Sequence, residues 1–207
     1  MASDSVEAER SRRSGSARPA KIVLLHGAAL VLRIELRNIR PVIHRTIVVP
    51  CGITLSRLHM TLLRAMGWNG GHLHEFVING VRYGEPDPEY PEPGLKNERR
   101  LRLDKVLEGA TRFEYVYDFG DHWAHEVRVV EEAISSGALD SPWCLEGANA
   151  CPPEDVGGAP GYLHFLQAIA DPTHPEHDEM LRWHGKRFDP AAFDLQEVNQ
   201  RLRRVRV

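Results

Sequence analysis

The sequence lacks the features of a membrane protein or of a secreted, disulfide-rich protein. No apolar stretch approaches the roughly 20 residues of a membrane-spanning helix, and His26 and Arg33 interrupt the run from 22 to 36. That run continues as an alternating strand pattern, so a secretory signal with a cleavage site is not predicted. Three cysteines, an odd number, do not suggest a disulfide framework. We therefore expect a cytoplasmic protein with no membrane contact.

The chain also lacks an excess of basic residues. Lys and Arg total 26 against 29 Asp and Glu, which gives a net charge of -3. Proteins dedicated to duplex nucleic acid usually carry a basic surplus, so the overall charge does not support a nucleic-acid partner. Basic residues do gather near both ends, at Arg10, Arg12 and Arg13 and at Arg201, Arg203, Arg204 and Arg206. A basic tail is more often solvated than used as a binding arm.

Familiar catalytic motifs are missing as well. The sequence contains no phosphate-binding loop, dinucleotide fingerprint, H-E-x-x-H or G-x-S-x-G pattern. What it does contain is enough hydrophobic sequence, 42% of 207 residues, for a core. Residues 1–20 show no regular spacing of apolar residues and are expected to form a disordered tail. The remainder, 21–207, is predicted to be a single domain.

The pattern of the central segment, Phe113 to Val130, predicts a β-hairpin. Alternate residues are apolar in each half, which is typical of strands with one buried face. The register that sets aromatic residues opposite apolar partners pairs Phe119 with Trp123, Tyr117 with His125, and Tyr115 with Val127. It also places Glu114 opposite Arg128, an attractive pair. The predicted loop is then Gly120, Asp121 and His122.

The remaining elements follow from the same patterns. Strands are expected over about 29–37, 42–49, 72–78 and 81–83, and helices over 55–66, 162–170, 175–184 and from 195 onward. Thr54 and Gly67 are the expected caps of the first helix, and Asp194 with Glu197 forms a capping box. The segment 101–107 is one or two helical turns. The segment 131–139 is a short helix or an irregular link, and 144–158 is a loop because it is rich in Pro and Gly.

The order of these elements predicts the fold class. Strands come early and helices come late, which is typical of an α+β fold and not of an alternating α/β fold. We expect antiparallel β-hairpins, about five to six strands in all, packed with helices and followed by a helical C-terminal part.

One group of residues suggests a metal site. His72 and His74 are two residues apart on one strand face, which is a spacing that can chelate a transition metal. Asp121 and His125 would complete a set of four ligands, with Asp118 as a further candidate. The alternative is that His74 belongs to the core, because Phe76 and Ile78 share its face.

The tip of the central hairpin and the Pro-rich loop together form a candidate polar site. Its residues are Asp118, Asp121, His122, His125, Glu154 and Asp155. Glu154 and Asp155 precede two glycines, so they could bind a cation or position water, or cap a helix that begins near Gly161.

Two thiols, Cys144 and Cys151, lie in the same Pro-rich loop. Their spacing is wider than that of a zinc knuckle. A disulfide, a nucleophilic thiol and two packed thiols are all compatible with it, and a nucleophile would need a histidine to lower its pKa. Two structural thiols are the favoured interpretation.

Several segments, in order, resemble the plasmid pRiA4b ORF-3-like family of bacterial and archaeal proteins. They are IRPVIHRTIVVP, TLSRLHMTLLRAMGW, HLHEFVING, YDFGDHWAHEV, CLEGANACPPEDVGG, DPTHPEH and FDPAAFDLQEVN. The resemblance implies an α+β domain of unestablished function and supplies no catalytic assignment. Some relatives carry a transposon-resolvase label, which implies a serine nucleophile near an arginine cluster. Ser56 lies in a predicted amphipathic helix with only Arg57 and Arg64 nearby, so we do not transfer that label.

Three hypotheses for function follow. The leading one is a binding or accessory module with an unknown protein or small-molecule partner and a polar surface at the hairpin tip. The second is an enzyme that depends on a transition metal bound by the His/Asp cluster. The third is a DNA-associated factor of mobile elements, which rests only on the family context and the basic termini.

Overall fold

The structure is a computed structural model that describes residues 28–134, 139–185 and 187–207. The predicted disordered tail, residues 1–20, lies outside the described residues. Within them, eight strands and five helices make up the fold. The expected α+β class is confirmed, although the sheet has more strands than the five to six we expected.

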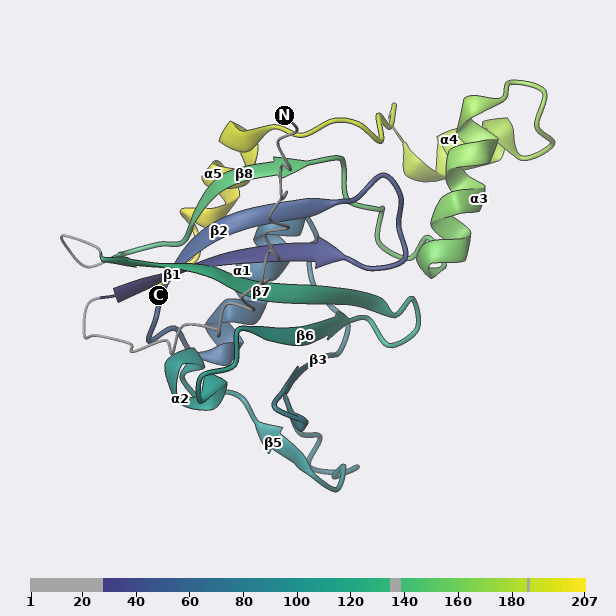
Figure 1. Ribbon diagram of the computed structural model, residues 1–207. Coiled ribbons are helices and arrows are strands. Elements are labelled where there is room, and N and C mark those ends of the chain that lie inside the picture. Colours follow the sequence, from purple (N-terminus) through teal and green to yellow (C-terminus); the bar gives the residue numbers. More distant parts are fainter. Residues whose placement is uncertain (1–27, 135–138, 186) are drawn as a thin grey trace, which may run out of the picture.

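All the strands belong to one sheet. They are β1 (Ala28–Leu36), β2 (His44–Pro50), β3 (His74–Ile78), β4 (Val81–Gly84), β5 (Leu95–Asn97), β6 (Arg112–Tyr117), β7 (Trp123–Ile134) and β8 (Trp143–Ala148). Their order across the sheet is β5-β4-β3-β6-β7-β1-β2-β8 (Figure 1). Neighbours are antiparallel except for β4 and β5, which are parallel.

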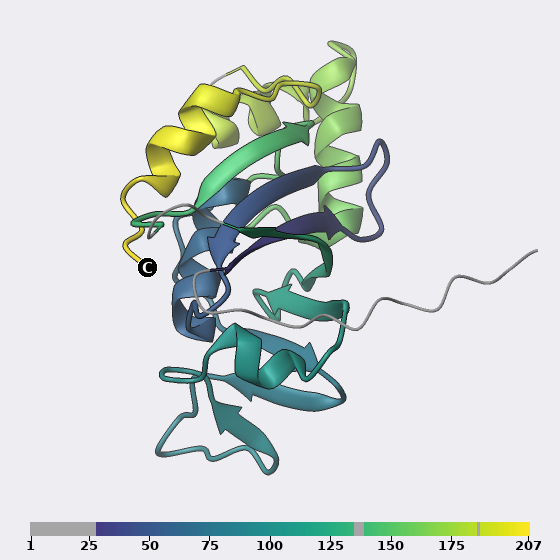
Figure 2. The same cartoon turned by 60° about the vertical axis from the view of Figure 1, so that its left-hand side comes forward.

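The helices gather on one face and at one end of this sheet. They are α1 (Leu55–Met66), α2 (Leu103–Leu107), α3 (Gly158–Ala170), α4 (His177–His184) and α5 (Leu195–Leu202). The long helix α1 lies across one face, and α5 packs beside it (Figures 1 and 2). Thr54 and Gly67 cap α1 as predicted. None of the described helices is long and apolar enough to cross a membrane.

The core lies between α1 and the sheet. Alternate residues of β1, from Leu30 to Leu36, are 0–1% exposed and belong to the same buried cluster as the apolar stripe of α1. Burying one such leucine contributes roughly 1.5–3 kcal/mol, so this interface is the main source of stability. The side chain of buried Asn199 on α5 binds both the N–H and the C=O of Cys144, which holds the edge strand β8 against the helix.

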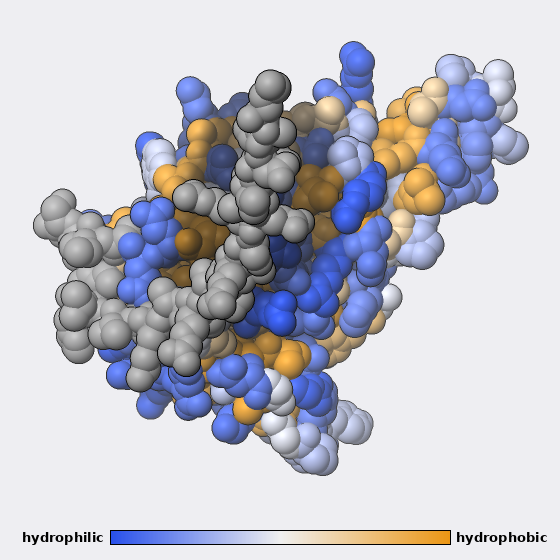
Figure 3. Space-filling model, viewed as in Figure 1, coloured by the Kyte–Doolittle hydropathy of each residue, from blue (hydrophilic) through white to orange (hydrophobic). Residues whose placement is uncertain are grey.

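The pair α3 and α4 extends beyond the end of the sheet (Figure 1). Its inner side contributes Phe165 and Tyr162 to the core. Its outer side leaves Leu163 and Trp183 exposed, and Figure 3 shows hydrophobic residues over this part of the molecule.

The opposite face of the sheet carries ordered rows of charge. The register places three glutamates in one row across β1, β7 and β6, namely Glu35, Glu126 and Glu114. The neighbouring row holds three arginines, Arg33, Arg128 and Arg112. On the other side of the glutamate row, Arg37 binds Glu114 at 2.6 Å and Glu126 at 3.3 Å. Each glutamate therefore contacts at least one arginine, which offsets the repulsion within the row. Glu35 pairs with Arg33 and Glu114 with Arg37, and Glu126 pairs with both Arg128 and Arg37.

The observed register of the central hairpin corrects our expectation by two residues. Tyr117 pairs with Trp123 and Tyr115 with His125, so residues 118–122 form the loop. The pairing of Glu114 with Arg128 was wrong, because Glu114 lies opposite Glu126. The reason is Asp118, whose backbone has φ 58° and whose carboxylate accepts hydrogen bonds from the next turn. This local turn ends the strand before Phe119, which is exposed.

Other boundaries also differ from the sequence-based expectations. Residues 143–148, mostly expected to be loop, form β8 because β2 offers them an edge to pair with. Residues 131–134 continue β7, and 135–138 lie outside the described part. The helix expected to start at Pro175 begins at His177. Residues 95–97, which lie in none of the expected elements, form β5. The strand expected over 72–78 begins at His74, so His72 lies in the preceding loop.

The charged rows allow a test of the observed register. Replacing Arg37 by Ala leaves Glu114 and Glu126 facing each other without a shared cation, so the free energy of unfolding should fall by about 0.5–1 kcal/mol. The loss should be smaller in a Glu114→Gln background. Urea denaturation of the four proteins of this cycle measures both values, and equal losses in the two backgrounds would contradict the pairing.

Candidate functional site

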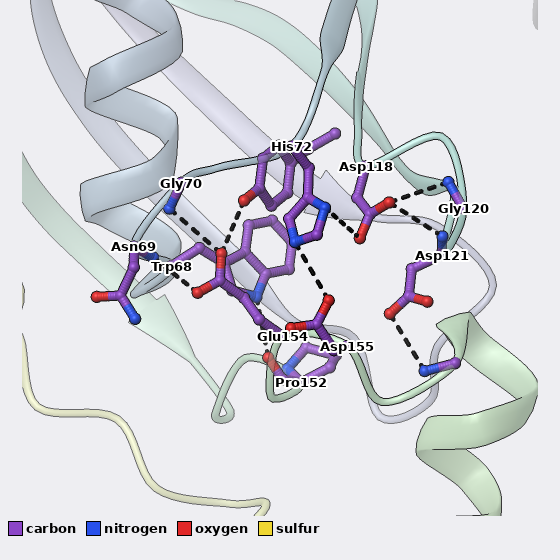
Figure 4. A network of polar contacts seen from close by, with 12 residues as sticks. Trp68, Asn69, Gly70, His72, Asp118, Gly120, Asp121, Pro152, Glu154 and Asp155 are labelled. Atoms are coloured by element: carbon purple, nitrogen blue, oxygen red, sulfur yellow. Dashed lines mark hydrogen bonds and ion pairs between the residues drawn. The ribbon is translucent and has the colours of Figure 1, made fainter.

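Three loops meet at the end of the sheet near α3 (Figure 4). They are the link from α1 to β3, the tip of the β6–β7 hairpin, and the link from β8 to α3. Each contributes backbone groups and polar side chains to a continuous network. These residues are far apart in the sequence, so only the fold brings them together.

Glu154 connects two of these loops to the sheet. Its carboxylate accepts hydrogen bonds from Asn69 N at 3.0 Å and Gly70 N at 3.2 Å, and from the Tyr117 hydroxyl at 2.7 Å. Burial and the neighbouring Glu154 raise the pKa of Tyr117, so this hydroxyl keeps its proton and donates. The indole Nε1 of Trp68 donates to Pro152 O at 3.0 Å and joins the same two loops again.

Asp118 is held at the hairpin tip by its own turn. Its Oδ1 accepts from Gly120 N at 2.9 Å and Asp121 N at 3.3 Å, and its N–H donates to Leu73 O at 2.9 Å. One carboxylate oxygen is thus used by the turn, and the other, Oδ2, points at His72 (Figure 4).

His72 lies between two carboxylates. Its Nδ1 is 3.5 Å from Asp118 Oδ2, and its Nε2 is 3.2 Å from Asp155 Oδ1. One nitrogen or oxygen from each residue lies within 4.8 Å of those of the other two. We call this set the His72 cluster. A nitrogen and two carboxylate oxygens so close together are a suitable donor set for a divalent cation.

Asp121 and Gly158 dock α3 against the hairpin tip. The Asp121 carboxylate accepts a hydrogen bond from Gly157 N at 3.2 Å, at the start of α3. Gly158 has φ +67°, and a Cβ there would lie 2.5 Å from Asp121 O. Asp121 is therefore occupied with the helix, and Asp155 takes its place beside His72. His122, the other expected residue of the tip, is exposed.

His125 belongs to the core and not to the polar site. It is 0% exposed, and its Nδ1 donates to Tyr115 O at 3.2 Å. Burial lowers its pKa to about 4, so the ring is neutral under physiological conditions. Trp68 packs edge-on against it, and His125 is not among the residues whose ligand atoms gather around His72.

His74 belongs to a second polar group that sequence reasoning did not assemble. Its Nε2 lies 3.0 Å from Oε2 of Glu98, and both side chains are less than 10% exposed. His59 stacks face to face on His74, and its Nδ1 lies 2.8 Å from the Tyr115 hydroxyl. No local pattern marks Glu98, which lies in a charged segment. The predicted metal set of His72, His74, Asp121 and His125 is thus distributed over four places.

Cys144 and Cys151 form no disulfide. Burial raises the pKa of both thiols, that of Cys151 to about 12, so neither has the thiolate character of a nucleophile. Arg45 lies near both thiols. It is 3% exposed and donates to the carbonyl groups of Ala65, Ala148 and Asn149. This environment is consistent with structural thiols.

The C-terminal arginines are partly used within the fold. Arg201 donates to Arg64 O at 3.1 Å and pairs with Glu197 at 2.8 Å, and Arg203 lies over the ring of Trp143. These contacts give the basic cluster a structural role, and they do not add to the case for DNA.

The comparison with known families decides the identity of the domain. A family model described as plasmid pRiA4b ORF-3-like protein matches residues 28–197. The chain belongs to this family. The match contains all three loops of the site as well as the whole sheet.

Two relatives extend the comparison. The uncharacterized protein y4hQ of Sinorhizobium fredii (strain NBRC 101917 / NGR234) is 41% identical over 171 residues, which cover 82% of this chain and 88% of that protein. The crystal structure of MM3350 from Methanosarcina mazei Go1, a protein of unknown function, superposes with a TM-score of 0.73 at 31% identity. It covers 82% of this chain and 97% of that one. The fold is therefore shared with MM3350, and the function has to be argued from the site.

The buried His125 predicts a specific loss of stability in acid. Above pH 6.5 the ring is neutral in both states, but below it the unfolded chain takes up a proton that the folded protein resists until about pH 4. His125 should therefore lower the free energy of unfolding by on the order of 3 kcal/mol near pH 4. Chemical denaturation from pH 7 to pH 4 should show that the free energy of unfolding declines less steeply in His125→Gln than in the wild type. His122→Gln, at an exposed position, should follow the wild type. An unchanged slope in His125→Gln would contradict the assignment.

Proposed function

We propose that this domain binds a divalent transition metal at the His72 cluster. The observation that carries the proposal is the approach of His72, Asp118 and Asp155 from three separate loops to within 4.8 Å of one another. A single imidazole with two carboxylates suits Zn²⁺, Mn²⁺ or Fe²⁺, since imidazole favours zinc and iron and carboxylates favour manganese.

The surroundings support a positioned site. The Asp118 turn and the Glu154 network fix the loops that carry the ligands, as outer hydrogen bonds do in metal centres. His72 also packs edge-on against the Tyr117 ring at 5.8 Å between centroids, which restrains its orientation. The two carboxylates face different ring nitrogens of His72, so one nitrogen would bind the ion and the side chains would turn toward a common point.

Three protein ligands leave coordination positions for water or another ligand. Closed structural zinc sites use four protein ligands, whereas catalytic and ligand-binding centres keep a position open. The proposed metal would therefore have an open position for a bound molecule. Such a site is compatible with both a binding module and a metal-dependent enzyme.

The test is the metal content and metal affinity of purified, tag-free protein. Elemental mass spectrometry should give about one zinc, manganese or iron per chain, and calorimetric titration of chelator-treated protein should show one site. His72→Ala and Asp155→Ala should each weaken the affinity at least about tenfold. Both positions are partly or largely exposed, so these variants should stay folded.

His122→Ala is the matched control, because it removes an exposed histidine from the same hairpin tip without touching the cluster. Its metal affinity should equal that of the wild type. Substoichiometric metal after reconstitution, or equal affinity in all four proteins, would rule the site out.

A further inference from the structure

A cleft of about 230 Å³ lies between α3 and α4. We call it the helical cleft. Helix α3 contributes His164 to its lining, and helix α4 contributes Glu179 and Trp183. The loop before α3 contributes Asp155, whose carboxylate also faces His72. Small-molecule sites usually measure about 300–1,000 Å³, so this cleft suits a single side chain better than a whole small molecule.

The inner part of the cleft is apolar. Val156 and Met180 line it, and both are partly buried and pack against the hydrophobic core. Gly161 holds the loop close to α3, because a Cβ at this position would lie 2.0 Å from Val156 O. The aliphatic part of a long side chain can therefore be buried here while its polar end stays near the rim.

The rim of the cleft carries an exposed aromatic ring. Trp183 is 46% exposed, and its ring meets that of Phe165 edge-on, with centroids 5.8 Å apart. Helix α4, which the structure describes from end to end, has no buried residue. Leu163 and Leu181 are also exposed on these two helices, and Figure 3 shows hydrophobic residues gathered over them. Apolar surface that continues beyond a cleft of this size indicates contact with another protein chain.

The charge of the cleft is negative. Asp155 and Glu179 line it, and no lysine or arginine occurs among the described residues of its lining. The ring of His164 contacts the carboxylate of Glu176, so the local charge stays negative whether or not this ring is protonated. Asp155 is shared with His72, but Glu179 is exposed and no described residue forms an ion pair with it. A cationic group is therefore the complementary partner.

We infer that the helical cleft holds an arginine or lysine side chain from a basic segment of a protein partner. The aliphatic stem of that side chain packs on Val156 and Met180, and its cationic end lies against the ring of Trp183 and pairs with Glu179. Arginine is a frequent anchor residue at protein interfaces, where it fills pockets of this kind. The cleft does not depend on the proposed metal, because Glu179 and Trp183 are not part of the His72 cluster.

The experiment is an NMR titration of chelator-treated protein with the peptide acetyl-GLRLG-amide, in which one arginine lies between two leucines. The indole N–H signal of Trp183, identified by its loss in Trp183→Leu, should shift in a saturable way. The signal of Trp143, which is 40% exposed on β8, is the matched control and should not shift. The same peptide with glutamine in place of arginine should bind at least about fivefold more weakly. Added salt should also weaken the binding of the arginine peptide.

A pair of neighbouring variants tests the charge of the cleft. Glu179→Gln should weaken the binding of the arginine peptide at least about threefold, because it removes the carboxylate that pairs with the cation. Asp178→Asn is the matched control, since it removes the same charge from the same first turn of α4. Asp178 is exposed and does not line the cleft, so the affinity of this variant should equal that of the wild type.

Three results would overturn the inference. The first is no saturable shift of the Trp183 signal, or equal losses of affinity in Glu179→Gln and Asp178→Asn. The second is binding of argininamide as tight as that of the peptide, which would assign the cleft to a small amine. The third is peptide binding only after removal of residues 1–20, which contain Arg10, Arg12 and Arg13, because the basic tail of the chain would then be the occupant. The peptide is titrated without metal, so its result is independent of metal binding at the His72 cluster.

Discussion

The arrangement of the site depends on the hydrogen bonds to one carboxylate, that of Glu154. Backbone N–H groups of the loop after α1 and the hydroxyl of Tyr117 all donate to it. A charged acceptor makes such bonds roughly twice as strong as neutral ones, and the partly buried position limits competition from water. Through Glu154, the loop before α3 is tied both to the sheet and to the loop that carries His72. Asp155, the next residue, is thereby placed opposite His72.

Two polar groups lie side by side at the end of the sheet, and β6 contacts both. His72 precedes β3, whereas His74 is the first residue of that strand. Tyr117 packs edge-on against His72, and Tyr115, two residues earlier on β6, lies beside His74. The His72 cluster and the pair of His74 with Glu98 are therefore neighbours that share the support of one strand.

Much of the fold could be predicted from local patterns, and the errors have local causes. The caps of α1, the N-cap Asp194 of α5 and the alternation of β6 and β7 are set by residues close together in the sequence. The hairpin register was wrong because Asp118 forms a turn that pairing preferences do not reveal. Strand β8 was missed because its stability comes from β2 and from Asn199 on a distant helix. Such contacts have no signature within the strand itself.

The expectation that His72 and His74 share one strand face was wrong, because β3 begins at His74 and His72 lies in the preceding loop. For the candidate site, the sequence by itself determined the kinds of residue present. It also identified the hairpin tip and the Glu154–Asp155 segment as polar regions. Only the tertiary structure decided which of these residues meet. It grouped Asp118 and Asp155 with His72, used Asp121 to hold α3, buried His125, and gave His74 a partner in Glu98. The physical reason is that these distances are set by how loops from three parts of the chain pack at the end of one sheet, and no local pattern encodes that packing.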